Sequence, residues 1–103
     1  MCAPRMRLEL SSRAGRDIQS IRLFGLRTWG VQQANAYDAQ LSDGLAHLQR
    51  HSALGTPRDD LQPGLRAWRV QQHRILYRVD GATLSVLRIV HVRQGVIGDL
   101  LQP

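Results

Sequence analysis

Lysine is missing from this sequence, so all 14 of its Lys+Arg positions are arginines. Lysine is the basic side chain whose pKa shifts far enough on burial to serve as a base or a Schiff-base amine, and that chemistry is therefore excluded. Arginine stays charged and binds carboxylates or phosphates through a planar fork. With 8 Asp+Glu the formal net charge is +6, which favours an acidic protein or a nucleic acid as partner.

Cysteine is almost absent, because Cys2 is the only one. One cysteine cannot form an intrachain disulfide or a thiolate metal cage, which favours a reducing compartment. The first ten residues mix Arg5, Arg7 and Glu9 with apolar residues and lack the apolar core of a signal peptide. No uncharged apolar run is long enough to span a membrane. We therefore expect a cytoplasmic protein that does not enter a membrane.

Aromatic residues are also scarce, and this bears on nucleic-acid binding. A surface that stacks on bases needs several aromatic side chains together. We expect the helical aromatics to pack between helices and Tyr77 to lie in the core, which leaves one of the five to stack on a base. Direct nucleic-acid binding is therefore not expected. The five aromatic residues are Phe24, Trp29, Tyr37, Trp68 and Tyr77.

Hydrophobic periodicity predicts a strand followed by two helices. Met6, Leu8 and Leu10 alternate with charged residues, as in a half-buried strand. Helices are predicted from about residue 12 to 28 and from 31 to 50, and the short break at Gly30 predicts an antiparallel hairpin. On the first helix Leu23 lies nearly opposite the apolar stripe, so it is exposed unless a partner covers it.

The period changes to two after a loop expected over residues 52–64. Strands are predicted over 65–70, from 73 to a type I′ turn at Asp80–Gly81, and over 84–92. Leu41, Tyr77 and Trp29 are assigned to the core, and residues 94–103 form a C-terminal tail. The order β-α-α-β-β-β predicts one α+β domain over 1–103, in which an N-terminal helical hairpin packs on one face of an antiparallel sheet.

Four histidines are the side chains able to titrate near neutral pH. His47 and His51 have the helical spacing that lets two imidazoles share a metal, but no third ligand accompanies them and a solvated helix end explains them better. His73 and His91 fall in strands and could form a general acid–base pair, although a strand histidine is more often a hydrogen-bonded structural residue. We expect no metal and no cofactor.

A set of short motifs occurs in a fixed order between Leu8 and Arg93. They are Ser12-x-Ala14-x-x-Asp17-Ile18-x-x-Ile21, Trp29-Gly30 followed by Gln33-Ala34 and Tyr37, Gly64-Leu65-Arg66, His73-x-Ile75-x-Tyr77, and Leu87-Arg88-Ile89-x-His91. The ordered set resembles the ParE toxins of the ParE/RelE family. The resemblance implies a RelE/ParE-like fold and the toxin of a type II toxin–antitoxin pair, which inhibits DNA gyrase and is neutralised by a ParD-like antitoxin.

RelE-like relatives on the same fold instead cut mRNA on the ribosome, and this chain matches them poorly. Arg74 and Arg93 stand where those enzymes also place arginines, but their strand lysines are missing and Asp99 occupies the position of their C-terminal tyrosine. Two guanidiniums that stay charged cannot supply the acid and the base that cleavage needs. The resemblance therefore favours a binding inhibitor over an enzyme, with a RelE-like endonuclease that uses His73, His91 and arginines as the alternative.

Two groups of residues are candidate binding sites. Leu23 and an arginine-rich sheet offer apolar and charged contacts to an acidic or amphipathic antitoxin segment that folds on binding. The expected antitoxin-binding residues are Leu23, Leu26, Trp68, Arg69, Arg74 and Arg78. In ParE-like toxins the C-terminal segment is implicated in poisoning gyrase, and here that segment is apolar. The expected target-binding residues are Arg93, Val96, Ile97, Leu100 and Leu101.

Overall fold

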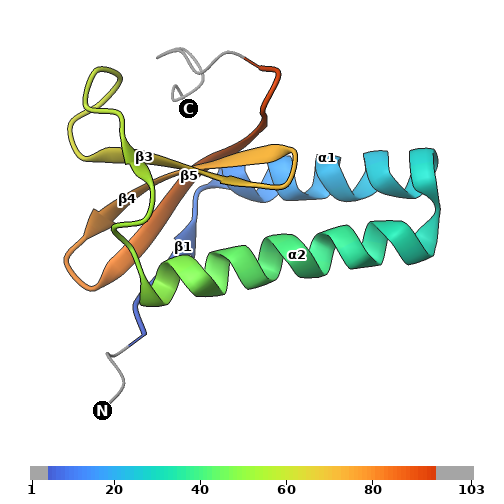
Figure 1. Ribbon diagram of the computed structural model, residues 1–103, viewed down its shortest axis with the longest axis horizontal. Helices are drawn as coiled ribbons and strands as arrows, with labels where there is room; N and C mark the ends of the chain where they lie inside the picture. The colour runs from blue at the N-terminus through green and yellow to red at the C-terminus, as the bar shows by residue number, and fades with distance from the viewer. Residues whose placement is uncertain (1–4, 95–103) are drawn as a thin grey trace.

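Two long helices pack on one face of a five-stranded sheet in the computed structural model, which describes residues 5–94 (Figure 1). Both helices run side by side, and their connecting turn projects well beyond the sheet. Within residues 5–94 no helix is long and apolar enough to cross a membrane. The elements are β1 (Arg7–Leu10), α1 (Ser12–Trp29), α2 (Val31–Arg50), β2 (Thr56–Pro57), β3 (Leu65–Val70), β4 (His73–Asp80) and β5 (Thr83–His91).

The strands are ordered β1-β5-β4-β3-β2, and the sheet is mixed. The α+β class and the helical hairpin on one face are confirmed. β3, β4 and β5 pair antiparallel as expected, and β2 adds an antiparallel pairing with β3, whereas β1 runs parallel to β5, with Leu8 opposite Leu84. No tight turn joins these two strands, so the turn chemistry read from the sequence does not constrain their direction. β2 lies inside the expected loop and is too short to show a period of two.

The core lies mainly between the helices and the sheet. Tyr77 is fully buried there, and its hydroxyl donates to Ser52 O at 2.7 Å and accepts from Gly55 N at 2.8 Å. A smaller cluster of Leu65, Leu76 and Val90 lies on the other face, where Leu61 of the 52–64 loop covers it. The main cluster comprises Ala14, Leu45, Leu48, Ile75, Tyr77, Leu84, Val86 and Ile89.

Three expectations about burial have different outcomes. Leu41 and Tyr77 are buried as predicted. Assigning Trp29 to the core is wrong, since 45% of it is exposed, and Phe24 is 59% exposed. Both residues belong to the last two turns of α1, and the connecting turn that follows them projects past the sheet (Figure 1). Helical periodicity shows which face is apolar but not how far the sheet reaches under it.

The hairpin between β4 and β5 differs from its prediction by one residue. Asp80 pairs with Thr83, so the turn consists of Gly81 and Ala82. Gly81 has a φ of 61°, and Ala82 has no positive φ. A type I′ turn needs positive φ at both central residues, so that assignment is wrong.

Hydrogen bonds join the start of α1 to β5 at the point where β1 ends. Ser11 caps the helix by accepting from Ala14 N at 3.0 Å, and its hydroxyl donates to Leu87 O at 2.7 Å. One turn later the Asp17 carboxylate accepts from Arg88 Nε at 2.7 Å and from Ile89 N at 3.0 Å. The side chains of this ion pair are only 16% and 10% exposed. The Asp17 carboxylate therefore pairs with the Arg88 guanidinium and also accepts a hydrogen bond from a backbone N–H at the edge of β5.

We expect Asp17→Ala to lower the free energy of unfolding by about 3–5 kcal/mol, the usual effect of removing one partner of a buried ion pair. Urea denaturation of the purified protein measures this change. Asp38→Ala is the matched control, because the Asp38 pair with Arg22 is largely exposed and its loss should cost less than about 1 kcal/mol. Equal losses in the two variants would show that Asp17 does not anchor the helix.

Candidate functional site

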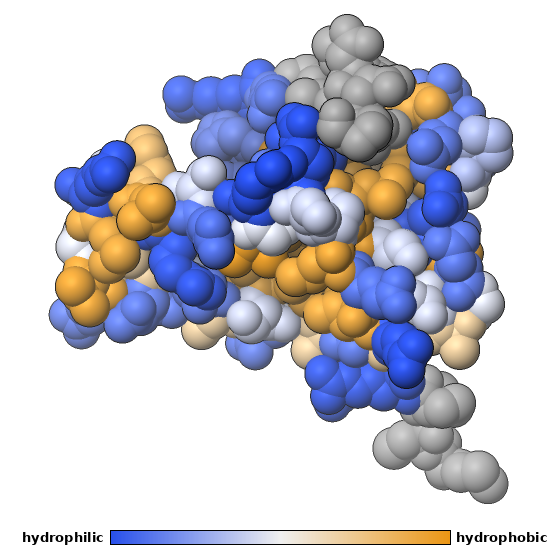
Figure 2. Space-filling view, turned by 180° about the vertical axis from the view of Figure 1, so that it is seen from behind, coloured by the Kyte–Doolittle hydropathy of each residue, from blue (hydrophilic) through white to orange (hydrophobic). Residues whose placement is uncertain are grey.

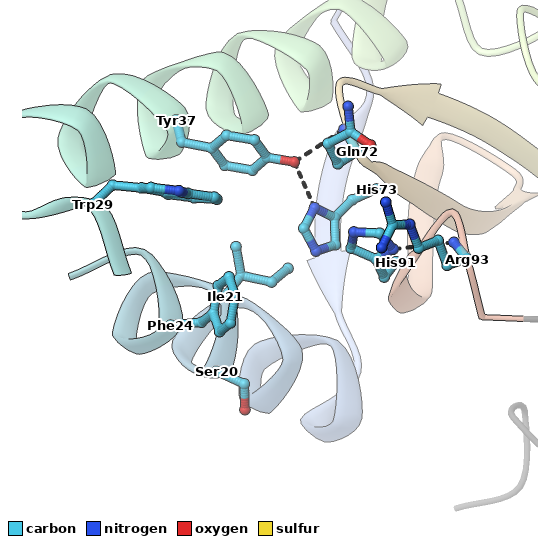
Figure 3. Close-up of a pocket in the computed structure, with 9 residues that line it drawn as sticks. All are labelled: Ser20, Ile21, Phe24, Trp29, Tyr37, Gln72, His73, His91 and Arg93. Carbon is cyan, nitrogen blue, oxygen red and sulfur yellow. Dashed lines mark hydrogen bonds between the residues drawn. The ribbon is translucent and has the colours of Figure 1, made fainter. Parts of the chain in front are cut away.

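A pocket of about 440 Å³ opens between the projecting hairpin and the end of the sheet near the β3–β4 turn. Its walls come from α1, α2, the β3–β4 turn and the ends of β4 and β5 (Figure 3). Aromatic and aliphatic side chains form one part, and histidines with an arginine form the other. The lining residues are Ser20, Ile21, Phe24, Trp29, Tyr37, Gln72, His73, His91 and Arg93.

A β-bulge brings the two strand histidines together. From the Asp80–Thr83 pair an unbroken register would place His73 opposite Val90, but the irregularity at Leu76/Tyr77 shifts the pairing so that His73 lies opposite His91. Their rings meet edge to face, with centroids 5.3 Å apart. Both imidazoles therefore face the same pocket.

Hydrogen bonds engage Nδ1 of both rings. The Tyr37 hydroxyl accepts from Gln72 N at 3.1 Å, so its own proton is available to His73 Nδ1, 2.5 Å away. His91 Nδ1 accepts from Arg93 N at 3.0 Å. Because His91 Nδ1 accepts, its ring proton is on Nε2, whereas the tautomer of His73 depends on which partner donates in the Tyr37 contact.

Burial is the largest influence on the pKa of both side chains of the Tyr37–His73 pair, and it favours the neutral form of each. Burial, then the charge of His91, lowers the pKa of His73 below its ordinary value, and Asp17 opposes this shift. Burial raises the pKa of Tyr37, with the Gln72 N–H acting in the opposite direction. The neutral form of His73 is therefore favoured at the pocket wall.

The apolar part of the pocket is an aromatic wall at the base of the hairpin turn. Phe24 and Trp29 meet edge to face at 5.6 Å between ring centroids, and the ring of Tyr37 lies 6.2 Å from that of Trp29. Phe24 and Trp29 are both exposed. This wall can pack against an apolar or planar group without any rearrangement of the core.

A second hollow, of about 540 Å³, adjoins the β2–β3 edge of the sheet. Arg69 and Arg74 are opposite one another in the register, and like charges in that position repel. Within residues 5–94 their guanidiniums bond only to backbone oxygens, those of Gln71 and Val92. We call this surface the arginine hollow; Thr56, Arg58, Ala67, Trp68, Arg69 and Arg74 line it.

The expected antitoxin-binding residues do not form one patch. Trp68, Arg69 and Arg74 meet at the arginine hollow. Arg78 lies apart and bonds to Asp80 and Gln62. Leu23 and Leu26 are 50% and 39% exposed in the last two turns of α1, next to the turn of the helical hairpin. A partner that used all six residues would have to wrap around the protein.

Leu23 and Leu26 belong to a larger apolar surface around the hairpin turn. Hydrophobic residues gather at the end of the molecule where the helices project, on the left of Figure 2. Polar side chains, such as Arg22, border them. A contiguous exposed apolar patch often marks a binding surface. We call it the hairpin patch; it comprises Leu23, Phe24, Leu26, Trp29 and Val31.

Of the expected target-binding residues, the structure places Arg93 alone. Arg93 is exposed and lines the pocket beside His91. The apolar members of this set lie outside the described residues 5–94. These are Val96, Ile97, Leu100 and Leu101.

The elements of the alternative nuclease reading are divided between two sites. Arg93 lines the pocket, whereas Arg74 lines the arginine hollow. His73 and His91 are adjacent, which sequence reasoning left open.

The two helix histidines line neither hollow, although His47 contacts Trp68 of the arginine hollow. The rings of His47 and His51 are 4.8 Å apart, and His47 also stacks on Trp68. In the described part of the chain no group of three His, Cys, Asp or Glu side chains is arranged to hold a metal.

Sequence reasoning missed Tyr37, Gln72 and Trp29 as site residues. Tyr37 and Trp29 were explained as helix packing, although both belong to the motifs that carry the family resemblance. Gln72 falls between the strands predicted over 65–70 and from 73, where the sequence indicates no function. Its role depends on the backbone N–H that it offers to Tyr37, and no side-chain pattern reveals such a contact.

Comparison with known proteins identifies the family. Residues 8–95 match the family described as ParE toxin of type II toxin-antitoxin system, parDE. Toxin ParE1 of Caulobacter vibrioides is 32% identical over 82 residues, which cover 80% of this chain and 84% of that protein. Toxin ParE1 of Mycobacterium tuberculosis is 33% identical over 73 residues, covering 70% and 74%.

Solved structures show the same fold at lower sequence identity. A chain of the chromosomal ParDE toxin–antitoxin system from P. aeruginosa aligns with a TM-score of 0.73 and 23% identity over 85% of this chain and 97% of its own. A chain of the RelBE2 toxin–antitoxin complex from Mycobacterium tuberculosis aligns with a TM-score of 0.63 and 22% identity, over 85% and 99%. Fold, ordered motifs and sequence identity agree, and the chain is a member of the ParE family of type II toxin–antitoxin toxins.

Proposed function

We propose that this chain inhibits DNA gyrase by binding to it, and that a ParD-like antitoxin neutralises it in the cytoplasm. The observation that carries this proposal is the ParE family match over residues 8–95. Gyrase inhibition is the activity that the resemblance to ParE toxins implies. The P. aeruginosa relative is described as a ParDE system, which supports a ParD-like protein as the partner.

Binding rather than catalysis is supported by the division of the arginines. A RelE-like cleavage site would need Arg74 and Arg93 around one phosphodiester, but they line different hollows. A guanidinium holds a phosphate yet does not move a proton at neutral pH. Inhibition by binding requires only a surface that is complementary to the target.

One observation favours the second candidate, a ribosome-dependent endonuclease. His73 and His91 are adjacent in a pocket with Arg93, so an imidazole pair and a cation are available in one place. In such an enzyme one histidine would take the 2′-hydroxyl proton and the other would protonate the leaving oxygen. His73→Ala and His91→Ala would then each abolish cleavage of mRNA.

The two antitoxin-contact surfaces suit a segment with apolar and acidic residues. The hairpin patch offers apolar side chains that the described part of the chain leaves exposed. At the arginine hollow, a carboxylate would relieve the repulsion between Arg69 and Arg74. An extended or amphipathic segment that folds on binding can reach both surfaces.

Leu23→Asp is expected to weaken antitoxin binding at least tenfold, about 1.4 kcal/mol, because it places a charge in an apolar contact. Calorimetric titration with the antitoxin measures the affinity. Gln40→Asp adds the same charge at an exposed position of α2 and should leave binding unchanged. If both variants bind like the parent protein, Leu23 lies outside the interface.

Deletion of residues 95–103 should abolish growth inhibition while preserving folding and antitoxin binding. The apolar tail residues are proposed to contact the target, and the described fold is complete before them. Growth assays with induced expression measure toxicity, and circular dichroism measures folding. A folded but fully toxic deletion variant contradicts the proposed target contact, as does a variant that unfolds.

A further inference from the structure

The polar end of the pocket consists of hydrogen-bond donors. His91 Nδ1 accepts from Arg93 N, so its ring proton is on Nε2, and the His73 ring lies edge to face beside it. Arg93 adds a guanidinium beside them, and no Asp or Glu lines the pocket (Figure 3). Such a donor set matches a group with several acceptor oxygens and a negative charge.

The other end of the pocket is built for a planar apolar group. Phe24 and Trp29 present exposed aromatic surface at its mouth, and Ile21 lies beside them (Figure 3). Stacking a base on an aromatic side chain is worth about 1–3 kcal/mol and tolerates any base. The sequence-based argument against base stacking rests on Phe24 and Trp29 packing between the helices, and their exposure removes that argument.

The volume favours a ligand larger than one amino-acid side chain. About 440 Å³ falls in the range of roughly 300–1,000 Å³ that small-molecule sites occupy. An aromatic ring, a sugar and a phosphate fit that space together, with the ring and the anion at opposite ends. The net charge of +6 favours an anionic ligand as well.

We propose that this pocket binds a nucleotide, with its base against Trp29 and Phe24 and its 5′-phosphate at His73, His91 and Arg93. This activity goes beyond gyrase inhibition. Nucleotide binding is measured on the isolated toxin, so a negative result would not count against the proposal that gyrase is the target. The nucleotide is either free or the phosphorylated end of a single strand, and both sources share the same chemistry.

The test is calorimetric titration of the full-length toxin with AMP, GMP, CMP and UMP. At least one should bind, and the matching nucleoside should bind at least tenfold more weakly because it lacks the phosphate. Trp29→Leu and Arg93→Gln should each weaken binding about tenfold, or about 1.4 kcal/mol. Arg16→Gln removes the same charge from an exposed position of α1 outside the pocket and should have no effect.

A nitrogen NMR spectrum adds a readout that a merely structural role would not change. The Nε2 resonances of His73 and His91 should shift on titration with the nucleotide and stay unchanged with the nucleoside. Circular dichroism of Trp29→Leu and Arg93→Gln confirms that lost binding is not lost folding. Short single-stranded DNA with and without a 5′-phosphate identifies the source: competition by the phosphorylated strand alone indicates a strand end, and no competition indicates a free nucleotide.

Several results would overturn the proposal. The first is that none of the four nucleotides binds at millimolar concentration. The second is that inorganic phosphate binds as tightly as the nucleotides do. The third is that Arg16→Gln loses as much affinity as Arg93→Gln. N-acetyltryptophan is an aromatic carboxylate of protein origin. If it binds as tightly as the nucleotides do, the pocket receives a partner protein's side chain and the nucleotide assignment is wrong.

Discussion

The contact of Asp17 with Arg88 and Ile89 N is the constraint on which the rest of the structure depends. β1 covers β5 only as far as Val86, and beyond that point the edge of β5 needs another partner. Asp17 supplies it from α1, with the Ser11 hydroxyl on Leu87 O just before it. Both contacts are polar and partly buried, so they are strongest in the orientation that aligns α1 with the strand edge.

Fixing α1 at its first turns lets the rest of the hairpin extend beyond the sheet. The overhang leaves the hairpin patch exposed and creates the pocket beneath Trp29. Tyr37 closes the inner side of that pocket by contacting both Gln72 N and His73. The proposed antitoxin surface and the proposed nucleotide site thus arise from one feature, a helical hairpin longer than the sheet it covers.

The sequence predicts the parts of this fold that depend on local pattern. The helix bounds and the burial of Leu41 and Tyr77 follow from hydrophobic periodicity. The direction of β1 and the exposure of Trp29 depend on where distant elements lie. The His73–His91 pair depends on a bulge, because a one-residue change of register would turn His73 away from His91. The family motifs included both histidines without revealing that contact.

The central claim is that the protein acts by occupying gyrase. The most direct measurement is a gyrase supercoiling assay with the purified toxin, run beside a translating extract in which mRNA integrity is followed. The account predicts that supercoiling is inhibited, that added antitoxin restores it, and that the mRNA stays intact. Unimpaired supercoiling together with cleaved mRNA would contradict the account and identify the His73–His91 pocket as a nuclease site.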